Sequence, residues 1–274
     1  MQKTLFLPFP KIVKTLVFLF FLLLGNSLLK AQEVEYSPIN TDRPGICDTP
    51  DLIEKGLFQI ETGYFFFQDE PNSSDKIKKQ YLPSTLLKYS FSDKFVLRLG
   101  VDALNLKTKI GDENTSQSGF APLTFGFKVP LIAAKGAMPK VSVITKINIP
   151  GTGSSSFDTD AANPQVKLLM LNNLSEKTYL YYNLSMDFGR GENRNIFGYS
   201  VALGRTVFDK MYLFGEVYGY FQGNGDDYHL LDGGITYAVS TRFQVDATAG
   251  IAISDISEDF YVGFGAAWNV RLKK

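Results

Sequence analysis

Apolar and polar residues alternate along most of the chain with a period of two. In FYVGFGAAWNVRL, residues 260–272, Phe260, Val262 and Phe264 belong to one face, and the intervening Tyr261 belongs to the other. Strict alternation over a dozen residues is typical of a β-strand with two different faces. These runs exceed the ~5–6 residues of a common globular strand, whereas a membrane-spanning strand needs about 9–11. The pattern therefore predicts strands that cross a membrane.

Similar runs recur through the chain after its first part. The second and sixth of them alternate less regularly than the others, and no helical heptads or composition break indicate a further domain. The runs predict about twelve strands, at residues 57–68, 79–90, 94–106, 121–131, 138–149, 163–174, 177–188, 195–208, 210–221, 228–239, 241–253 and 258–272.

The connections between these runs alternate in length. Short turns follow the even-numbered runs, as in FSDK at 91–94 and LSEK at 174–177. Long polar loops follow the odd-numbered runs, as in DEPNSSDKIK at 69–78 and KTKIGDENTSQSG at 107–119. Short turns on one rim and long loops on the other are typical of outer-membrane barrels. We therefore expect an all-β fold, an antiparallel up-and-down transmembrane β-barrel with both termini on the short-turn rim.

The N-terminal residues differ from the rest. Lys3, Lys11 and Lys14 lie around the start of an apolar stretch at residues 15–25, and small Ala31 follows. This order is typical of a signal peptide cleaved after Ala31, and the stretch is shorter than the roughly 18 residues of a membrane anchor. We expect residues 1–31 to be a signal peptide, 32–55 a lumenal plug or periplasmic segment, and 56–274 a barrel in the cell outer membrane.

Composition narrows the function classes. The expected leader carries four of the 28 basic residues and none of the 28 acidic ones, so the mature chain has a net charge of about −4. This is not the charge of a nucleic-acid-binding protein, and we expect no nucleic-acid partner. The chain has 23 Phe and 14 Tyr but a single His, which suits a barrel in contact with lipid.

The polar faces of the runs carry charges in a regular order. Strands two to six contribute basic residues, and later strands contribute acidic ones, so one lumen wall would be basic and the opposite wall acidic. These charges either neutralise one another across a packed interior or produce a transverse field that orients solutes. Tyr179, Tyr181, Tyr212, Tyr218 and Tyr220 either line a solute path or fill the lumen. The expected lumen-lining residues are Glu61, Lys88, Arg98, Asp102 (an exception on the basic side), Lys128, Lys146, Lys167, Asp187, Glu216, Asp232 and Asp246.

The stretch INTDRPG, residues 39–45, precedes the first expected strand. Pro44 restricts its own φ and favours an extended Arg43, and Gly45 permits a bend. Arg43 offers a planar fork to the acidic wall, and Asp42 can pair with the basic wall. We expect Asp42, Arg43, Pro44 and Gly45 to be a latch that holds a plug; the alternative is a mobile periplasmic tail.

A family resemblance starts at the same residues. TDRPG and DTPDLIEKGLFQIETGY, within 41–64, PLTFGFKVPL at 122–131 and INIPGTG at 147–153 resemble the phenol-degradation meta-pathway family of outer-membrane proteins. The resemblance implies an outer-membrane barrel that passes small hydrophobic or aromatic compounds. Many such barrels end on an aromatic residue that the assembly machinery reads, whereas this chain ends NVRLKK.

Other functions have weaker support. The single His229 shares its parity with the lipid-facing Leu231, and no Gly-x-Ser-x-Gly motif occurs, so a lipid-modifying enzyme with a Ser–His pair is not indicated. Acidic clusters at 111–114, 157–160 and 224–227 lack the spacing of an EF-hand. A structural or adhesive barrel with a sealed lumen is the main rival to a channel. We expect no catalytic residue, metal or cofactor; the expected partners are outer-membrane lipid, a small-molecule solute and the outer-membrane assembly machinery.

Overall fold

The computed structural model describes residues 39–72, 74–189, 195–222, 227–254 and 259–271. The expected signal peptide at 1–31 and part of the acidic cluster at 224–227 lie outside these residues. Within the described ranges, no helix is long and apolar enough to cross a membrane. The elements are β1 (Leu57–Asp69), β2 (Lys76–Ser92), β3 (Phe95–Ile110), β4 (Glu113–Phe120), β5 (Thr124–Ile132), β6 (Lys140–Asn148), β7 (Pro164–Asn173), β8 (Thr178–Asp187), β9 (Ile196–Val207), β10 (Met211–Phe221), β11 (Tyr228–Ser240), β12 (Phe243–Ala252) and β13 (Phe260–Arg271).

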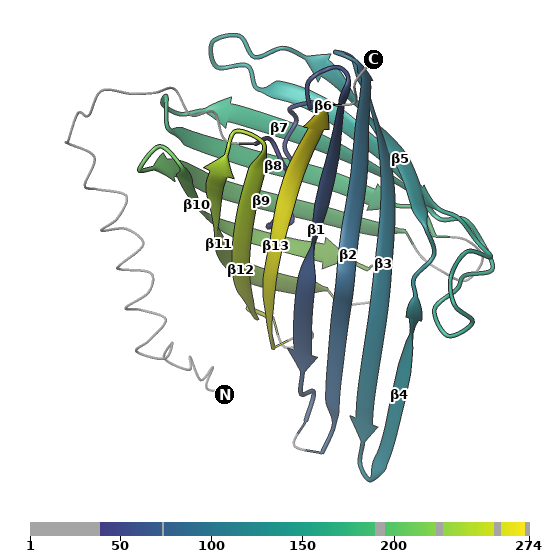
Figure 1. The fold of residues 1–274 in the computed structure, drawn as a ribbon. Coiled ribbons are helices and arrows are strands. Elements are labelled where there is room, and N and C mark those ends of the chain that lie inside the picture. The colour runs from purple at the N-terminus through teal and green to yellow at the C-terminus, as the bar shows by residue number, and fades with distance from the viewer. Residues whose placement is uncertain (1–38, 73, 190–194, 223–226, 255–258, 272–274) are drawn as a thin grey trace, which may run out of the picture. The chain divides into compact units, whose positions relative to one another are not determined.

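Twelve of these strands form a closed antiparallel ring (Figure 1). Successive strands are hydrogen-bonded neighbours around the ring, with β3 pairing directly to β5. The first strand closes onto the last, in a register that runs from Leu57 opposite Arg271 to Gln68 opposite Phe260. Closure gives every interior ladder position a partner, as a sheet surrounded by lipid requires. The predicted barrel of about twelve strands is confirmed.

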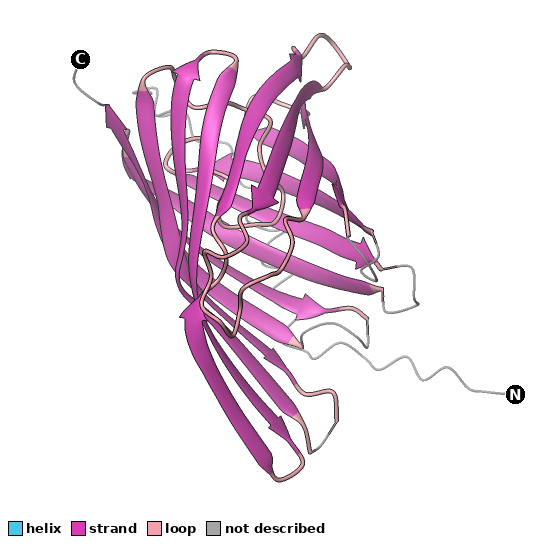
Figure 2. Cartoon of the chain, turned by 90° about the vertical axis from the view of Figure 1, so that its right-hand side faces the viewer, coloured by secondary structure: helices cyan, strands magenta, loops and turns pink. Residues whose placement is uncertain are grey.

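The prediction of a long loop at 107–119 is wrong. There β3 continues to Ile110, and after a turn at Gly111 the strand β4 runs back along it. The barrel-side half of β3 pairs with β5 and the outer half with β4. The outer parts of β2 and β3 together with β4, residues 76–81, 104–110 and 113–120, are called the β2–β3–β4 extension below. It projects beyond the long-loop rim (Figures 1 and 2).

The two faces of the wall differ as the alternation predicts. On β13, the outward Phe264 and Trp268 are 57% and 54% exposed, whereas the inward Tyr261 and Ala267 are 2% and 1% exposed. The outward side chains would lie in lipid, and the inward ones fill the lumen. Face assignment in β2 changes at Leu82–Pro83, where the register with β3 shifts. Proline cannot donate a ladder hydrogen bond, which explains the irregular alternation of the second predicted run.

The residues just before β1 lie among the inward side chains of the barrel. Residues 39–55, the N-terminal segment, form no strand, and their polar groups are bonded to residues of β1, β2, β5, β8, β10 and β12. Figure 1 shows this purple segment running within the ring before it enters β1. The inward side chains of the wall are therefore packed against the chain's own N-terminal segment.

Candidate functional site

Asp42 is the ionic centre of the site. Its carboxylate lies 2.8 Å from Nζ of Lys88 on β2 and 2.8 Å from Nζ of Lys128 on β5. Arg98 on β3 donates to the same carboxylate. The Asp42 backbone N–H donates to Glu61 at 3.1 Å, and Glu61 is also paired with Lys88. Three cations from adjacent strands thus converge on one buried carboxylate of the N-terminal segment.

Arg43 points to the opposite wall. Its guanidinium makes a two-pronged contact with Asp246 on β12, with Nε and Nη2 at 3.2 and 3.0 Å from the two carboxylate oxygens. The guanidinium also lies 4.8 Å from the ring centroid of Phe65. It fits there because Gly63 and Gly265 face each other across β1 and β13. A Cβ on Gly265 would lie 2.1 Å from Arg43 Nη2, and one on Gly63 would lie 2.4 Å from it.

Glu216 on β10 holds the residues that follow the latch. Its carboxylate accepts the backbone N–H groups of Ile46 at 2.8 Å and Cys47 at 2.6 Å. The sequence analysis explained Gly45 by a bend, and the chain does bend at residues 44–46; the structure adds a second reason. A Cβ on Gly45 would lie 2.5 Å from Glu216 Oε2, so glycine is needed for the close approach of this carboxylate.

The second half of the N-terminal segment is held by Lys167, which the sequence analysis selected, and by further residues that it did not select. Asp48 is ion-paired with Lys167, and its backbone N–H donates to Asn183 Oδ1 at 2.8 Å. Asp51 is paired with Lys140 at the short-turn end of β6. The only signal for these contacts was polar character at inward parity. Further inward polar residues bonded to the segment are Gln59, Ser142, Ser200 and Gln244.

The expected lumen-lining residues divide into two groups. Four of them have no hydrogen bond or ion pair to the N-terminal segment among the contacts of the described residues. Asp187 accepts from Gln165, Asp232 accepts from Tyr261, Asp102 lies opposite Ser84, and Lys146 lines a cavity. The seven that contact the segment are Glu61, Lys88, Arg98, Lys128, Lys167, Glu216 and Asp246.

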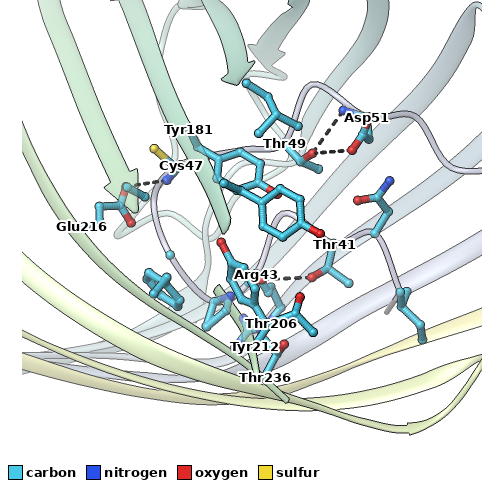
Figure 3. A pocket seen from close by; sticks show the side chains of 18 of the residues that line it. Thr41, Arg43, Cys47, Thr49, Asp51, Tyr181, Thr206, Tyr212, Glu216 and Thr236 are labelled. Carbon is cyan, nitrogen blue, oxygen red and sulfur yellow. Dashed lines mark hydrogen bonds between the residues drawn. The ribbon is translucent and has the colours of Figure 1, made fainter. Parts of the chain in front are cut away.

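The N-terminal segment separates two cavities. One, of about 310 Å³, is lined by strand residues near the short-turn rim together with Thr41, Arg43 and Cys47 (Figure 3). The other, of about 220 Å³, is lined by Asp42, Ile46, Asp48 and residues of β3 and β6–β10, and so reaches from the basic strands to the strands that follow them. Gly45 lines both. Residues on both sides of Gly45 contribute to each cavity, so the segment lies between the two cavities.

The tyrosines expected to line a path are distributed between these spaces. Tyr179, Tyr181 and Tyr212 line the cavity near the short-turn rim, with ring centroids 6.3 Å apart from Tyr179 to each of the others. Tyr220 lines the second cavity, of about 220 Å³. Tyr218 is buried against neighbouring apolar side chains and fills space rather than lining it.

The charge of Asp42 makes the docked segment sensitive to acid. Burial by itself would raise the pKa of Asp42, but Lys128, Lys88 and Arg98 outweigh it and hold the pKa well below its usual value. A carboxylate released into water has a pKa of about 3.9. We call the state with the segment bound inside the barrel the docked state. Above about pH 3.9, the charge of Asp42 makes its full free-energy contribution to this state. The contribution is lost as the pH falls towards the lower pKa that Asp42 has in the docked state.

We accordingly expect acid to loosen the docked segment. Openings in single-channel recordings should become more frequent as the pH falls below about 4, where Asp42 loses its contribution. Asp42→Asn lacks the titrating group, and its opening frequency should depend less on pH across this range. Equal acid sensitivity of the two proteins would contradict this explanation.

Comparison with known proteins identifies the family. The family model described as "Putative MetA-pathway of phenol degradation" matches residues 41–270. The chain belongs to this family. The match begins at Thr41, immediately before the latch, and the resemblance of Thr41–Tyr64 to the phenol-degradation family is confirmed. No curated protein matches the sequence.

Several solved structures have the same fold as this member of the phenol-degradation family. An outer-membrane channel from Pseudomonas putida F1 superposes with a TM-score of 0.67 at 10% identity, covering 88% of this chain and 100% of that one. The KdgM porin in complex with disordered oligogalacturonate superposes with a TM-score of 0.51 at 10% identity, covering 76% of this chain and 98% of the porin. The translocator domain of the autotransporter NalP from Neisseria meningitidis superposes with a TM-score of 0.51 at 12% identity, covering 80% of this chain and 90% of that domain. These likenesses show the fold of an outer-membrane barrel.

Proposed function

We propose that this protein is an outer-membrane channel for small hydrophobic or aromatic solutes, closed in the observed state by residues 39–55. The main support is the position of the N-terminal segment, which lies inside a closed barrel and separates two cavities that both reach Gly45. A solute crossing the lumen has to displace this segment. The latch residues Asp42, Arg43, Pro44 and Gly45 hold it against both walls.

Two observations support the proposed solute class: the side chains that line the cavity near the short-turn rim, and the family to which the chain belongs. The cavity of about 310 Å³ there combines tyrosine rings with Phe214 and Leu171, which suits a compound with an aromatic ring and a polar substituent. The family description refers to phenol degradation, and the similar Pseudomonas protein is described as an outer-membrane channel. A phenol-like solute therefore fits both lines of support.

An enzymatic role has no support at the one histidine. His229 Nδ1 lies 3.0 Å from the Tyr199 hydroxyl, and the ring lies beside Phe221, with centroids 5.5 Å apart. His229 shares its strand parity with the exposed Leu231, so it is on the outer face rather than in the lumen. We propose a transport role without a catalytic residue.

The sealed barrel remains the specific alternative, because the ion pairs of the N-terminal segment are almost fully buried. The deciding experiment is conductance of the mature chain in a planar bilayer, compared with a variant lacking residues 33–55. We expect the intact protein to be quiet and the deletion to conduct, because the deletion joins the two cavities. If both proteins are quiet while heat-modifiable gel migration shows folded barrels, the lumen is sealed by its own wall and the channel proposal fails.

A further inference from the structure

The outward face of the β2–β3–β4 extension carries a cluster of lysines. In the antiparallel register of β2 and β3, Lys76 lies opposite Lys109 and Lys78 lies opposite Lys107. Directly opposed residues share a face of the sheet. The intervening pair, Ile77 and Thr108, and the next pair, Lys79 and Leu106, lie on the other face, where Ile77, Lys79 and Leu106 line a cavity with Phe67. The four lysines of the two opposed pairs therefore point away from the lumen.

This lysine face is poorly compensated within the chain. Like charges directly opposite each other destabilise a sheet. Lys76 is ion-paired with Glu70, but Lys78, Lys107 and Lys109 make no ion pair with a described carboxylate. Two of the nearby acidic groups are engaged or turned away: Asp75 accepts hydrogen bonds from Asn72 and from the backbone of Gly111, and Glu113 lies opposite Ile110 on the other face. Three positive charges thus lack a partner in the described structure.

The cluster begins just beyond the aromatic part of the outer wall. Phe66 on β1 packs against Phe260 on the outer face, with ring centroids 6.0 Å apart. Gln80 lies opposite Phe66, and Lys78 is two residues farther along β2. At the ~3.3 Å rise of a strand, Lys78 lies about 7 Å beyond the aromatic level. Outward aromatic residues mark the membrane interface of such barrels, so the lysines are at headgroup depth.

A second strand pair gives the same order of residues. On β3 and β4, Ala103 lies opposite the exposed Phe120, Asn105 opposite Ser118, and Lys107 opposite Ser116. The outward face therefore changes from apolar to neutral polar to basic along the strands. This sequence parallels the change from hydrocarbon to charged headgroup across a lipid leaflet.

We propose that Lys78, Lys107 and Lys109, with Lys76 beside them, bind the phosphate groups of an anionic glycolipid in the outer leaflet. The lysine face is turned away from the lumen, so it does not lie on the path of a solute. Lysines at headgroup depth attract anionic lipid, and flexible ammonium groups can adapt to several phosphate oxygens. The inference rests on the orientation of the proposed channel, with its long-loop rim in the outer leaflet.

The test uses the full mature chain in detergent with lipid A, a diphosphorylated glycolipid, as the probe. Native mass spectrometry would measure bound lipid A for the wild type and for a variant with K78Q, K107Q and K109Q. The matched control is K55Q, K94Q and K135Q, which neutralises three exposed lysines near the short-turn rim. We expect affinity to fall about fivefold for each lysine of the cluster and to stay unchanged in the control.

Two further readouts separate the possible outcomes. Removing one phosphate from lipid A should weaken binding to the wild type, because phosphate supplies the attraction. If the cluster variant binds lipid A as tightly as the control variant, or if both lose affinity equally, the proposed site is wrong. Bilayer conductance of the cluster variant should match the wild type. Failure of lipid binding is therefore distinguishable from failure of the channel proposal.

Discussion

Replacing Asp42 with asparagine is expected to turn a quiet barrel into one that conducts. Asparagine keeps the size of the side chain and removes the charge that Lys88, Arg98 and Lys128 share. Removing one partner of a buried ion pair costs about 3–5 kcal/mol. When the segment leaves its position, water can solvate these cations. The substitution therefore destabilises the docked state and leaves the undocked state nearly unchanged. We expect the open fraction in planar bilayers to rise about a hundredfold or more.

A control for this prediction lies on the same segment. Asp51→Asn also removes one carboxylate, but its partner Lys140 is 40% exposed at the side chain, and such a pair contributes about 0–1 kcal/mol. We expect D51N to stay nearly as quiet as the wild type. Similar conductance of D42N and D51N would show that the three-cation contact does not hold the segment.

Gly265→Ala is expected to release the segment from the other wall. The added methyl would lie 2.1 Å from Arg43 Nη2 and 2.4 Å from its Cζ, so the guanidinium has to leave its position between β1 and β13. Asp246, whose side chain is fully buried, then loses its partner. Overpacking of this kind costs about 1–3 kcal/mol. Conductance recordings should show openings about tenfold or more above the wild-type frequency.

A double-mutant cycle with Arg43→Ala tests the cause of the Gly265 effect. Without the Arg43 side chain, the methyl at position 265 has no guanidinium to displace. The double variant should therefore open as often as R43A alone, which gives a large coupling between the two sites. Additive effects would place the cost of the substitution in the β1–β13 pairing rather than in the position of Arg43.

The barrel was predictable because lipid fixes both faces of each strand. The alternation at residues 260–272 corresponds to outward Trp268 and inward Tyr261 on β13, and the alternation of turn lengths indicates closure. The β2–β3–β4 extension was not predicted by this pattern. Residues 113–118 are polar on both faces and resemble a loop in sequence, as expected of a strand that lies beyond the hydrocarbon layer.

The candidate site was predictable only where full charges are involved. Asp42 and Arg43 could be assigned to opposite walls because the strands carried opposite charges in order, and the structure places them against Lys88 and Asp246. Their role as a latch stays a prediction. The contact of Asn183 with the backbone of Asp48 depends on the path of the segment inside the ring, which no local pattern encodes.

The position of the N-terminal segment also affects how the barrel assembles. Arg43 contacts Asp246, which is 203 residues away in sequence, so this contact can form only when the last strands are nearly in place. A ring that closed without the segment would leave Lys88 and Lys128 without their shared carboxylate. Because contacts between distant residues form slowly, we expect ring closure and docking of the segment to occur as one cooperative late step of folding.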